Sequence, residues 1–314
     1  DYYQSPVLRS RSREEFSKAD IVIDVGGEYD HSKCLYDHHQ RSYEEKFDAK
    51  VKQDEDGNEI KKERCTKLSA SGLVYRHYGK IVIQNIYPSL NEKELDLVYL
   101  KVYNGFMEAI DAVDTGVEQV ADGGKLVYKE STTLSRRVGR LNPRWNEDPL
   151  PNMDERFEQA SALCGDDFLQ ILSQIVESDM PARAFVEQAV LKRLDVDPSG
   201  EIIKFESGGM PWKGHLYDLE KEHKLDPLVK FVLYTDQAGM WRVQAVTVEG
   251  QAFENRLSLP EKWRGVRDEE LESISGIAGS KFCHAAGFIG GAATFEGALK
   301  MAQAALAEEK TSSN

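Results

Sequence analysis

The sequence predicts an α/β protein, and three observations on its 314 residues support that fold class. Short apolar runs such as Ile21–Ile23 lead into polar clusters, as buried strands do at the carboxyl edge of an open sheet. From Thr66 the apolar residues recur at helical spacing, and from Ile202 short β-rich runs return. We therefore predict a parallel-sheet domain over residues 1–155, followed by a helical connector and a smaller α+β domain over residues 156–314.

Composition narrows the class of protein further. Hydrophobic residues make up 40% and charged residues 30%, which is typical of a globular protein with a real core. No apolar run approaches the roughly 18 residues of a membrane helix, so no membrane partner is expected. The net charge of −14 argues against a general polyanion-binding surface but allows a local basic channel or a metal-bridged phosphate. Four scattered cysteines favour free thiols in a reducing, intracellular compartment.

The stretch Ile21–Gln40 is the richest in candidate metal ligands. Asp24 follows the first apolar run, and Asp37, His38 and His39 follow the second. Carboxylate and imidazole together suit Mn²⁺, Fe²⁺, Zn²⁺ or Mg²⁺ better than soft metals. The alternative is that the acids are turn residues and the histidines ordinary core or surface residues. Two adjacent histidines in a strand face opposite sides, so one could bind metal while the other orients a substrate or a second ion.

Two helices are predicted to follow, the first ending at Gly79 and the second capped by Asn91. The second helix carries Asp111 and Asp114 near its end, where the helix dipole disfavours carboxylates. A bound cation would explain this placement. The alternative is a capped turn that ends at Gly116.

A basic segment lies beyond these helices. Residues 131–133 open an amphipathic stretch whose polar face carries Arg136, Arg137 and Arg140. This face could contact a polyanion, although a solvated helix face is the default interpretation of such a charge run.

The last third of the chain is predicted to be rich in strands. The candidates are Ile202–Phe205, Val229–Tyr234 and Trp241–Val248, of which the last two are joined by a hairpin turn at Thr235–Gly239. Residues Asp195–Glu206 match the spacing of a calcium-binding loop. Because a strand rather than a helix follows, we interpret Asp197–Gly200 as a helix-to-strand turn.

The stretch Lys281–Gly291 is predicted to be a strand start and a glycine-rich loop before the closing helix. The backbone amides of Gly287, Gly290 and Gly291 could hold a phosphate or carboxylate, and His284 could contact the same anion. The alternative is a tight strand-to-helix connection in which the glycines serve geometry alone.

Taken in order, these motifs resemble the DHH phosphoesterase superfamily and, more narrowly, its eukaryotic Myg (melanocyte-proliferating-gene-1) branch. The Asp-His-His triplet alone is a weak signal, whereas the ordered set is strong. The likeness runs over essentially the whole chain and rests on Asp24–Asp30, Tyr36–Ser42, Thr66–Leu73, Asp111–Asp114, Leu134–Val138, Asp197–Glu201, Tyr234–Gly239 and His284–Gly291.

The resemblance implies a DHH-type first domain that works as a metal-dependent 3′→5′ RNA exonuclease, in the mitochondrion, the nucleus or both. It makes Asp24, Asp37 and His38 ligands of Mn²⁺ or Mg²⁺. An acid at the helix end, Asp114 or its neighbour Asp111, would complete the shell. A phosphatase or pyrophosphatase acting on small phosphoesters is an alternative, as is a non-catalytic binding protein on a degenerate DHH fold.

The resemblance also implies the residues that contact a single-stranded RNA or a nucleotide phosphoester. His38 and His39 would be the catalytic histidines, with His39 on metal or on the scissile phosphate. Residues 287–291 match the substrate-holding motif of the DHH-associated second domain. That motif often has a histidine after the paired glycines, where this chain has Ala292. The predicted substrate-binding residues are His39, Arg136, Arg137, His284, Gly287, Gly290 and Gly291.

One motif of the family is absent from these residues. The family opens with a His-x-Gly-x-Phe-His-x-Asp-Glu segment that supplies further metal ligands, and the given sequence does not contain it. Either the sequence is truncated or the segment has been lost. We expect a chain that begins at Asp1 to hold a two-metal centre poorly, which would leave it inactive.

Overall fold

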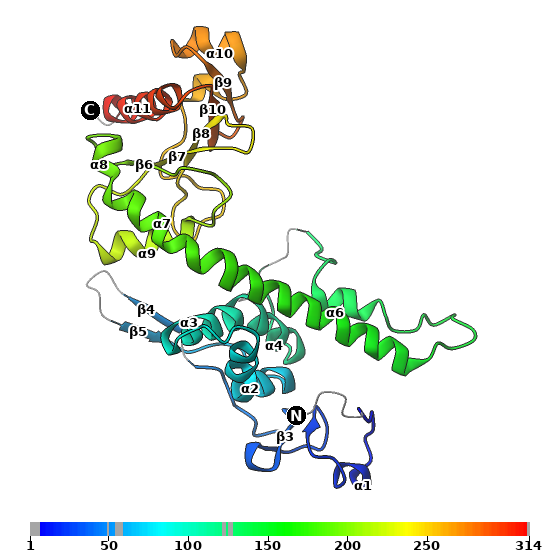
Figure 1. Cartoon of the computed structure of the whole chain (residues 1–314). Coiled ribbons are helices and arrows are strands. Elements are labelled where there is room, and N and C mark those ends of the chain that lie inside the picture. The colour runs from blue at the N-terminus through cyan, green and yellow to red at the C-terminus, as the bar shows by residue number, and fades with distance from the viewer. Residues whose placement is uncertain (1–6, 49, 54–58, 121–123, 125–127, 313–314) are drawn as a thin grey trace. The chain divides into compact units, whose positions relative to one another are not determined.

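The structure is a computed structural model that describes residues 7–48, 50–53, 59–120, 124 and 128–312 (Figure 1). The described residues form both helices and strands, in agreement with the predicted α/β class, and the described elements from Ala70 to Val196 are all helical. The chain forms two compact units, Asp1–Ile175 and Val176–Asn314. The boundary predicted before residue 156 falls inside helix α6 (Met153–Ser173), 20 residues ahead of the division between the units.

The sheet of the first unit is small. Its strands are β1 (Val22–Ile23), β3 (Leu35–Tyr36) and β2 (Tyr29–Asp30), in the order β1-β3-β2. Only β1 and β3 run parallel, because β2 pairs antiparallel with β3. The parallel sheet expected here is thus reduced to one pair of short strands. Gly26 and Gly27 explain part of the difference, since their φ angles of 103° and 72° turn the chain soon after β1.

Helix α2 (Ala70–Ile86) begins at Ser69, whose side chain caps its first turn. The helix does not end at Gly79 as expected but continues through it. Gly79 is a packing residue, because a Cβ there would lie 2.8 Å from the ring of Tyr75 and 2.9 Å from the ring of Tyr99. The tight approach of these two rings selects glycine without breaking the helix.

The second predicted helix is also present. Asn91 caps α3 (Glu92–Val102) through a capping box with Glu94, as the sequence predicted. A π-helical turn, η2 (Tyr103–Met107), then joins α3 to α4 (Glu108–Asp114). The other described elements of this unit are α1 (Arg13–Phe16), η1 (His31–Lys33), the antiparallel strands β4 (Lys50–Gln53) and β5 (Glu59–Lys62), α5 (Leu134–Gly139) and α6.

The second unit is built on a five-stranded sheet of order β6-β7-β8-β10-β9. The predicted strands and hairpin turn are confirmed, with β6 and β7 parallel and the other neighbours antiparallel. Residues 197–200 form a helix-to-strand turn after α8 (Arg193–Val196), as expected. The strands are β6 (Ile202–Lys204), β7 (Phe231–Thr235), β8 (Trp241–Ala245), β9 (Ser280–Cys283) and β10 (Ile289–Ala292).

Two hydrophobic cores cover the two faces of this sheet. Alternate residues of one strand enter different cores, as the period of a strand requires: Phe231 packs in one core and Val232 in the other. The first core includes Met301 of the closing helix, and the second includes Leu216.

The helices and helical turns of this unit are η3 (Gln174–Asp179), α7 (Met180–Leu191), α8 (Arg193–Val196), α9 (Lys213–Glu222), η4 (Glu261–Trp263), α10 (Asp268–Ser275) and α11 (Phe295–Ser312). None of the described helices combines the length and the apolarity needed to cross a bilayer.

Candidate metal centre

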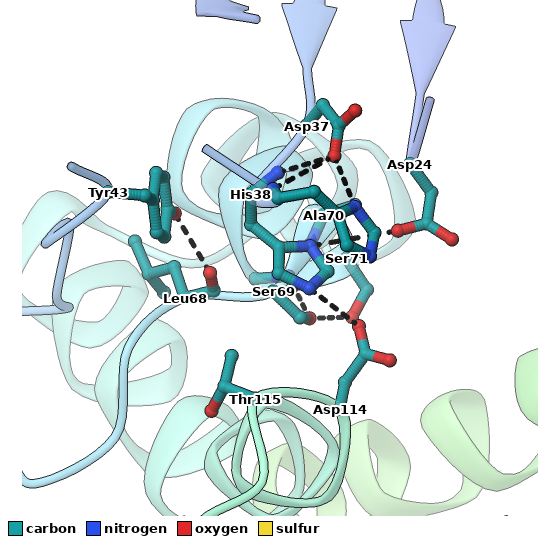
Figure 2. Close-up of polar contacts among 12 residues, drawn as sticks. Asp24, Asp37, His38, Tyr43, Leu68, Ser69, Ala70, Ser71, Asp114 and Thr115 are labelled. Carbon is teal, nitrogen blue, oxygen red and sulfur yellow. Dashed lines mark hydrogen bonds and ion pairs between the residues drawn. The ribbon is translucent and has the colours of Figure 1, made fainter. Parts of the chain in front are cut away.

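The parallel pair of strands brings two carboxylates together. The register Ile23 opposite Tyr36 places Asp24 and Asp37 next in line at the carboxyl ends of β1 and β3. The N–H of Asp24 donates to the carbonyl of Tyr36 at 2.9 Å, which holds the two strand ends together. Figure 2 shows Asp24 and Asp37 at the ends of these neighbouring strands. Asp24 has a φ of 63°, a left-handed conformation that acids adopt more readily than most residues. The strand end thus turns sharply at a candidate ligand.

Asp37 is buried, and both of its oxygens accept hydrogen bonds. Oδ1 accepts from the backbone N–H of His38 at 2.7 Å and from Nδ1 of His39 at 2.6 Å, while Oδ2 accepts from the N–H of Gly27 at 2.6 Å. Burial raises the pKa of this carboxyl, but the hydrogen bonds from Gly27 and His39 outweigh it and hold the pKa below its ordinary value. Asp37 is therefore an anion, and Oδ2 keeps a free lone pair for a ligand.

His39 is oriented by this contact. Its Nδ1–H points at Asp37, and this hydrogen bond raises the pKa of the imidazole above its ordinary value. In the neutral ring the lone pair is then on Nε2, and the side chain is 61% exposed. A carboxylate that fixes the tautomer of a histidine in this way is common around metal-ligating imidazoles. His39 can bind a cation or accept a proton through Nε2.

His38 lies between two further carboxylates. Its Nδ1 is 3.6 Å from Asp24 Oδ1, and its Nε2 is 3.7 Å from Asp114 Oδ2. The N–H of Ala70, in the first turn of α2, donates to Nδ1 at 3.2 Å. The ring is nearly buried and stacks on that of His39, with 4.2 Å between the ring centroids. Helix α2 and the end of α4 thus close the site around His38 (Figure 2).

Three of the predicted metal ligands form one cluster with His39. Asp24, Asp37, His38 and His39 each offer a ligand atom, and these atoms lie within 4.8 Å of one another. No second cluster of this kind occurs in the part of the chain that the structure describes. Burial and the nearby Asp114 raise the pKa of Asp24, so the carboxylates repel one another in the absence of a cation. A divalent ion would relieve this repulsion. Two carboxylate oxygens and two imidazole nitrogens are suitable ligands for Mn²⁺, Fe²⁺, Zn²⁺ or Mg²⁺.

The two acids at the helix end occupy different environments. Asp114 is half exposed and faces His38, as described above. Asp111 is fully buried, where its carboxylate accepts from the N–H of Ser69 at 2.9 Å, the hydroxyl of Ser69 at 2.7 Å and the hydroxyl of Tyr103 at 2.7 Å. Of the two predicted ligands, the structure brings Asp114 beside the cluster and encloses Asp111 in the packing under α2.

The predicted substrate arginines lie on α5. Arg136 is exposed, whereas Arg137 is half-buried and forms an ion pair with Asp167 of α6 at 2.6 Å. Arg140 donates to the backbone carbonyl of Ser131 at 2.5 Å. Arg137 therefore helps to fix α5 on α6, which leaves Arg136 as the freer guanidinium for an anion.

The glycine-rich stretch of the second unit differs from the expectation. Gly290 and Gly291 lie in β10, which pairs with β8 on one edge and β9 on the other, so their amides are committed to the sheet. The prediction of an anion-binding loop is wrong for these two residues. Both positions are occupied by glycine because neighbouring side chains leave no room for a Cβ. A Cβ on Gly290 would lie 2.8 Å from Met301 Cε, and one on Gly291 would lie 2.5 Å from the ring of Phe282.

The remaining residues of that motif form the turn before β10. Gly287 has a φ of 70° and donates its N–H to the carbonyl of His284 at 2.8 Å, so this amide is also occupied. A Cβ at Gly287 would lie 2.6 Å from Arg264 Nε. His284 is exposed, and its Nδ1 accepts the N–H of Ala286 at 3.1 Å. Of the predicted anion-binding residues of this motif, His284 thus offers a polar side chain that is open to solvent.

A cavity beside the metal cluster contains residues that the sequence analysis did not select. It has a volume of about 520 Å³ and is lined by Arg11, Arg13, Phe16, Asp24, Val25, Gly26, Gly27, Asp37 and His39. The one feature of the sequence that could have drawn attention to them is the alternation of arginines at positions 9, 11 and 13. Its meaning depends on the way α1 folds back against residues 24–27, which the local sequence does not reveal.

Comparison with known proteins agrees with the motif pattern. Residues 1–306 match the sequence model of the MYG1 exonuclease family, described as an uncharacterised protein family (UPF0160). The MYG1 exonuclease of Rattus norvegicus is 47% identical over 309 residues, covering 98% of this chain and 78% of its own length. The MYG1 exonuclease of Homo sapiens is 46% identical over 309 residues, covering 98% and 80%. The MYG1 protein of Dictyostelium discoideum is 42% identical over 305 residues, covering 96% and 87%. No solved structure gives a significant match. The chain therefore belongs to the MYG1 exonuclease family.

Proposed function

We propose that this chain is a metal-dependent phosphodiesterase that removes nucleotides from the 3′ end of single-stranded RNA. The observation that carries the proposal is the cluster of Asp24, Asp37, His38 and His39, whose ligand atoms lie within 4.8 Å of one another. Relatives that share 46–47% of their residues with this chain bear the name exonuclease, which supports a nuclease-like hydrolase. The Asp-His-His motif supports phosphoester chemistry by its resemblance to the DHH superfamily.

The reaction would be attack of water on the last phosphodiester of the RNA. A bound divalent ion would lower the pKa of that water and neutralise charge on the phosphate oxygens. The new bond joins the water oxygen to phosphorus, and the bond from phosphorus to the preceding O3′ breaks. The products are a nucleoside 5′-monophosphate and an RNA that is one nucleotide shorter, whose O3′ takes a proton from solvent.

The contacts of each residue in the cluster indicate its role in this reaction. Asp37 holds the Nδ1–H of His39, so the Nε2 of His39 is directed to accept the proton lost by water or to contact the phosphate. Asp24 and Asp37 contribute the negative charge that retains a cation. His38, packed between Asp24 and Asp114, restricts the positions of both carboxylates.

The test is the hydrolysis of a 5′-labelled, single-stranded RNA by the full-length protein in the presence of Mn²⁺. We expect a ladder that shortens from the 3′ end, and we expect Asp37→Ala and His38→Ala to abolish it. Asp20→Ala is the matched control, because Asp20 is an exposed acid just ahead of β1 and outside the cluster. Equal activity in all four proteins would contradict the proposal. Turnover of pyrophosphate or free nucleotides without shortening of RNA would favour the small-phosphoester alternative.

A further inference from the structure

Three arginines alternate along the segment that leads into α1, and they point to two different places. Arg9 is engaged with α6, where Nη1 donates to the carbonyl of Met153 at 3.1 Å and lies 3.5 Å from Asp154. Arg11 and Arg13 instead line the cavity of about 520 Å³ that also contains Asp24, Asp37 and His39. The alternation therefore separates one structural arginine from two that border the candidate metal centre.

Among the residues that the structure describes, no carboxylate neutralises either of the two cavity arginines. Arg9 and Lys18 have acidic partners, but among the described residues no carboxylate oxygen lies within ion-pair distance of Arg11 or Arg13. Both residues are exposed. In a chain with a net charge of −14, two unpaired guanidiniums beside a carboxylate-rich centre leave room for an anion.

The packing of α1 explains why Arg13 stays at the rim of the cavity. The ring of Phe16 lies over Gly26, where an added Cβ would be 3.7 Å from Phe16 Cδ2 and 3.9 Å from Val22 Cγ1. The glycine turn that follows Asp24 thus accommodates the aromatic ring, and this contact fixes α1 against the strand end. The arginines and the metal cluster are parts of one local structure within the first unit.

We propose that Arg11 and Arg13 form a phosphate clamp for the terminal nucleotide, and that the cavity holds the product as a nucleoside 5′-monophosphate. The inference rests on the proposed phosphodiesterase function and adds the residues that bind the substrate. Guanidinium groups bind phosphate oxygens through paired hydrogen bonds. The cavity volume falls within the range of about 300–1,000 Å³ that is usual for small-molecule sites. Phe16, Val25 and the glycine turn supply an apolar wall for the nucleoside.

The two arginines act here as binding residues, because the contacts place their side chains around the cavity and not in the cluster itself. They would hold the phosphate while the cluster and its cation act on the bond. Their loss should therefore weaken the binding of nucleotide and raise KM for RNA more than it lowers kcat.

The experiment is titration calorimetry of the whole chain with adenosine 5′-monophosphate in the presence of Mn²⁺. We expect Arg11→Gln and Arg13→Gln each to weaken binding by about tenfold, the loss of one charge-assisted contact. Arg11→Lys should lose less affinity than Arg11→Gln, since lysine keeps the positive charge but lacks the paired N–H donors of the guanidinium. Lys18→Gln is the matched control: Lys18 is an exposed cation near α1 that pairs with Glu14 and does not line the cavity.

The clamp is overturned if the wild-type chain does not bind the nucleotide, if the glutamine variants bind it as tightly as the wild type, or if Lys18→Gln weakens binding equally. Circular dichroism of each variant verifies that the fold is retained. RNA hydrolysis, measured separately, distinguishes the two proposals. If the chain hydrolyses RNA but binds the nucleotide equally well without the arginines, the clamp is contradicted and the exonuclease proposal stands. Arginine-dependent binding without hydrolysis supports the clamp and contradicts the exonuclease.

Discussion

At the scale of single residues, two buried carboxylates of the first unit have different uses. Asp37 lies beside an open cavity, and its hydrogen bonds orient His39 and preserve the negative charge. Asp111 is enclosed, and its hydrogen bonds go to Ser69 and Tyr103, which join the start of α2 to the turn between α3 and α4. Burial raises the pKa of Asp111, as expected of an acid enclosed by packing. Asp111 is placed to stabilise the fold, and Asp37 to serve the site.

Replacement of Asp111 by alanine should therefore destabilise the protein. It leaves the N–H of Ser69 and the hydroxyl of Tyr103 without an acceptor inside the fold. We expect the free energy of unfolding to fall by about 2–4 kcal/mol in urea titrations of the metal-free chain. Asp114→Ala is the control and should change it by no more than about 0.5 kcal/mol, because Asp114 is half exposed. Unchanged stability of Asp111→Ala, with loss of Mn²⁺ binding, would identify Asp111 as a ligand instead.

The cluster could be predicted from sequence because its parts are local. Asp24 and the Asp37–His39 triplet each follow a short apolar run, so a strand end brings each of them to the same edge. The choice between Asp111 and Asp114 could not be made in this way. The two acids lie about one helical turn apart, and which of them faces inward depends on the packing of Ser69 and Tyr103.

At the scale of elements, a group of aromatic rings holds the small sheet on α2. The rings of His31 and His77 stack with 3.6 Å between their centroids, and the hydroxyl of Tyr29 lies 2.8 Å from His77 Nε2. Nδ1 of His31 lies 2.7 Å from the hydroxyl of Tyr36. Because Tyr36 precedes Asp37, this group supports the strand end that carries the candidate ligands.

The group should make stability depend on pH. Burial, and then the adjacent His31 and Arg76, lower the pKa of His77 below its ordinary value, although Glu45 opposes the shift. Below the unfolded-state pKa of about 6.5, the unfolded chain binds a proton that the folded chain resists, so stability falls as the pH decreases. His77→Phe keeps a ring on His31 but does not titrate. We expect its free energy of unfolding to decrease less between about pH 7.5 and 5 than that of the wild type. An equal decrease in both proteins would rule out His77 as the cause.

The glycine pair of β10 shows what local sequence cannot decide. Ile289–Ala292 contains two consecutive glycines, which are typical of loops, yet it is an inner strand of the sheet. The reason is tertiary, since Met301 and the ring of Phe282 approach the backbone too closely for side chains. By contrast, β6 and β7 were predictable because their apolar and β-branched runs reflect burial on both faces, and β8 because apolar and polar residues alternate along it.

At the scale of the whole molecule, charge and architecture set the conditions for the site. The chain has 54 acidic and 40 basic residues, so binding of an anion depends on a local arrangement of cations. Arg11 and Arg13 provide such an arrangement beside the metal cluster. The division between Ile175 and Val176 was not evident from sequence, because residues 153–191 are helical and contain no loop to mark a boundary.

The central claim is that the Asp24–Asp37–His38–His39 cluster binds a divalent metal ion. Titration of Mn²⁺ into the chain, followed by the electron paramagnetic resonance signal of the free ion, tests it directly. We expect one ion per chain to be withdrawn from the free signal, and we expect Asp37→Ala to abolish this binding while Asp20→Ala retains it. Binding by the wild type no stronger than that of Asp37→Ala would contradict the claim.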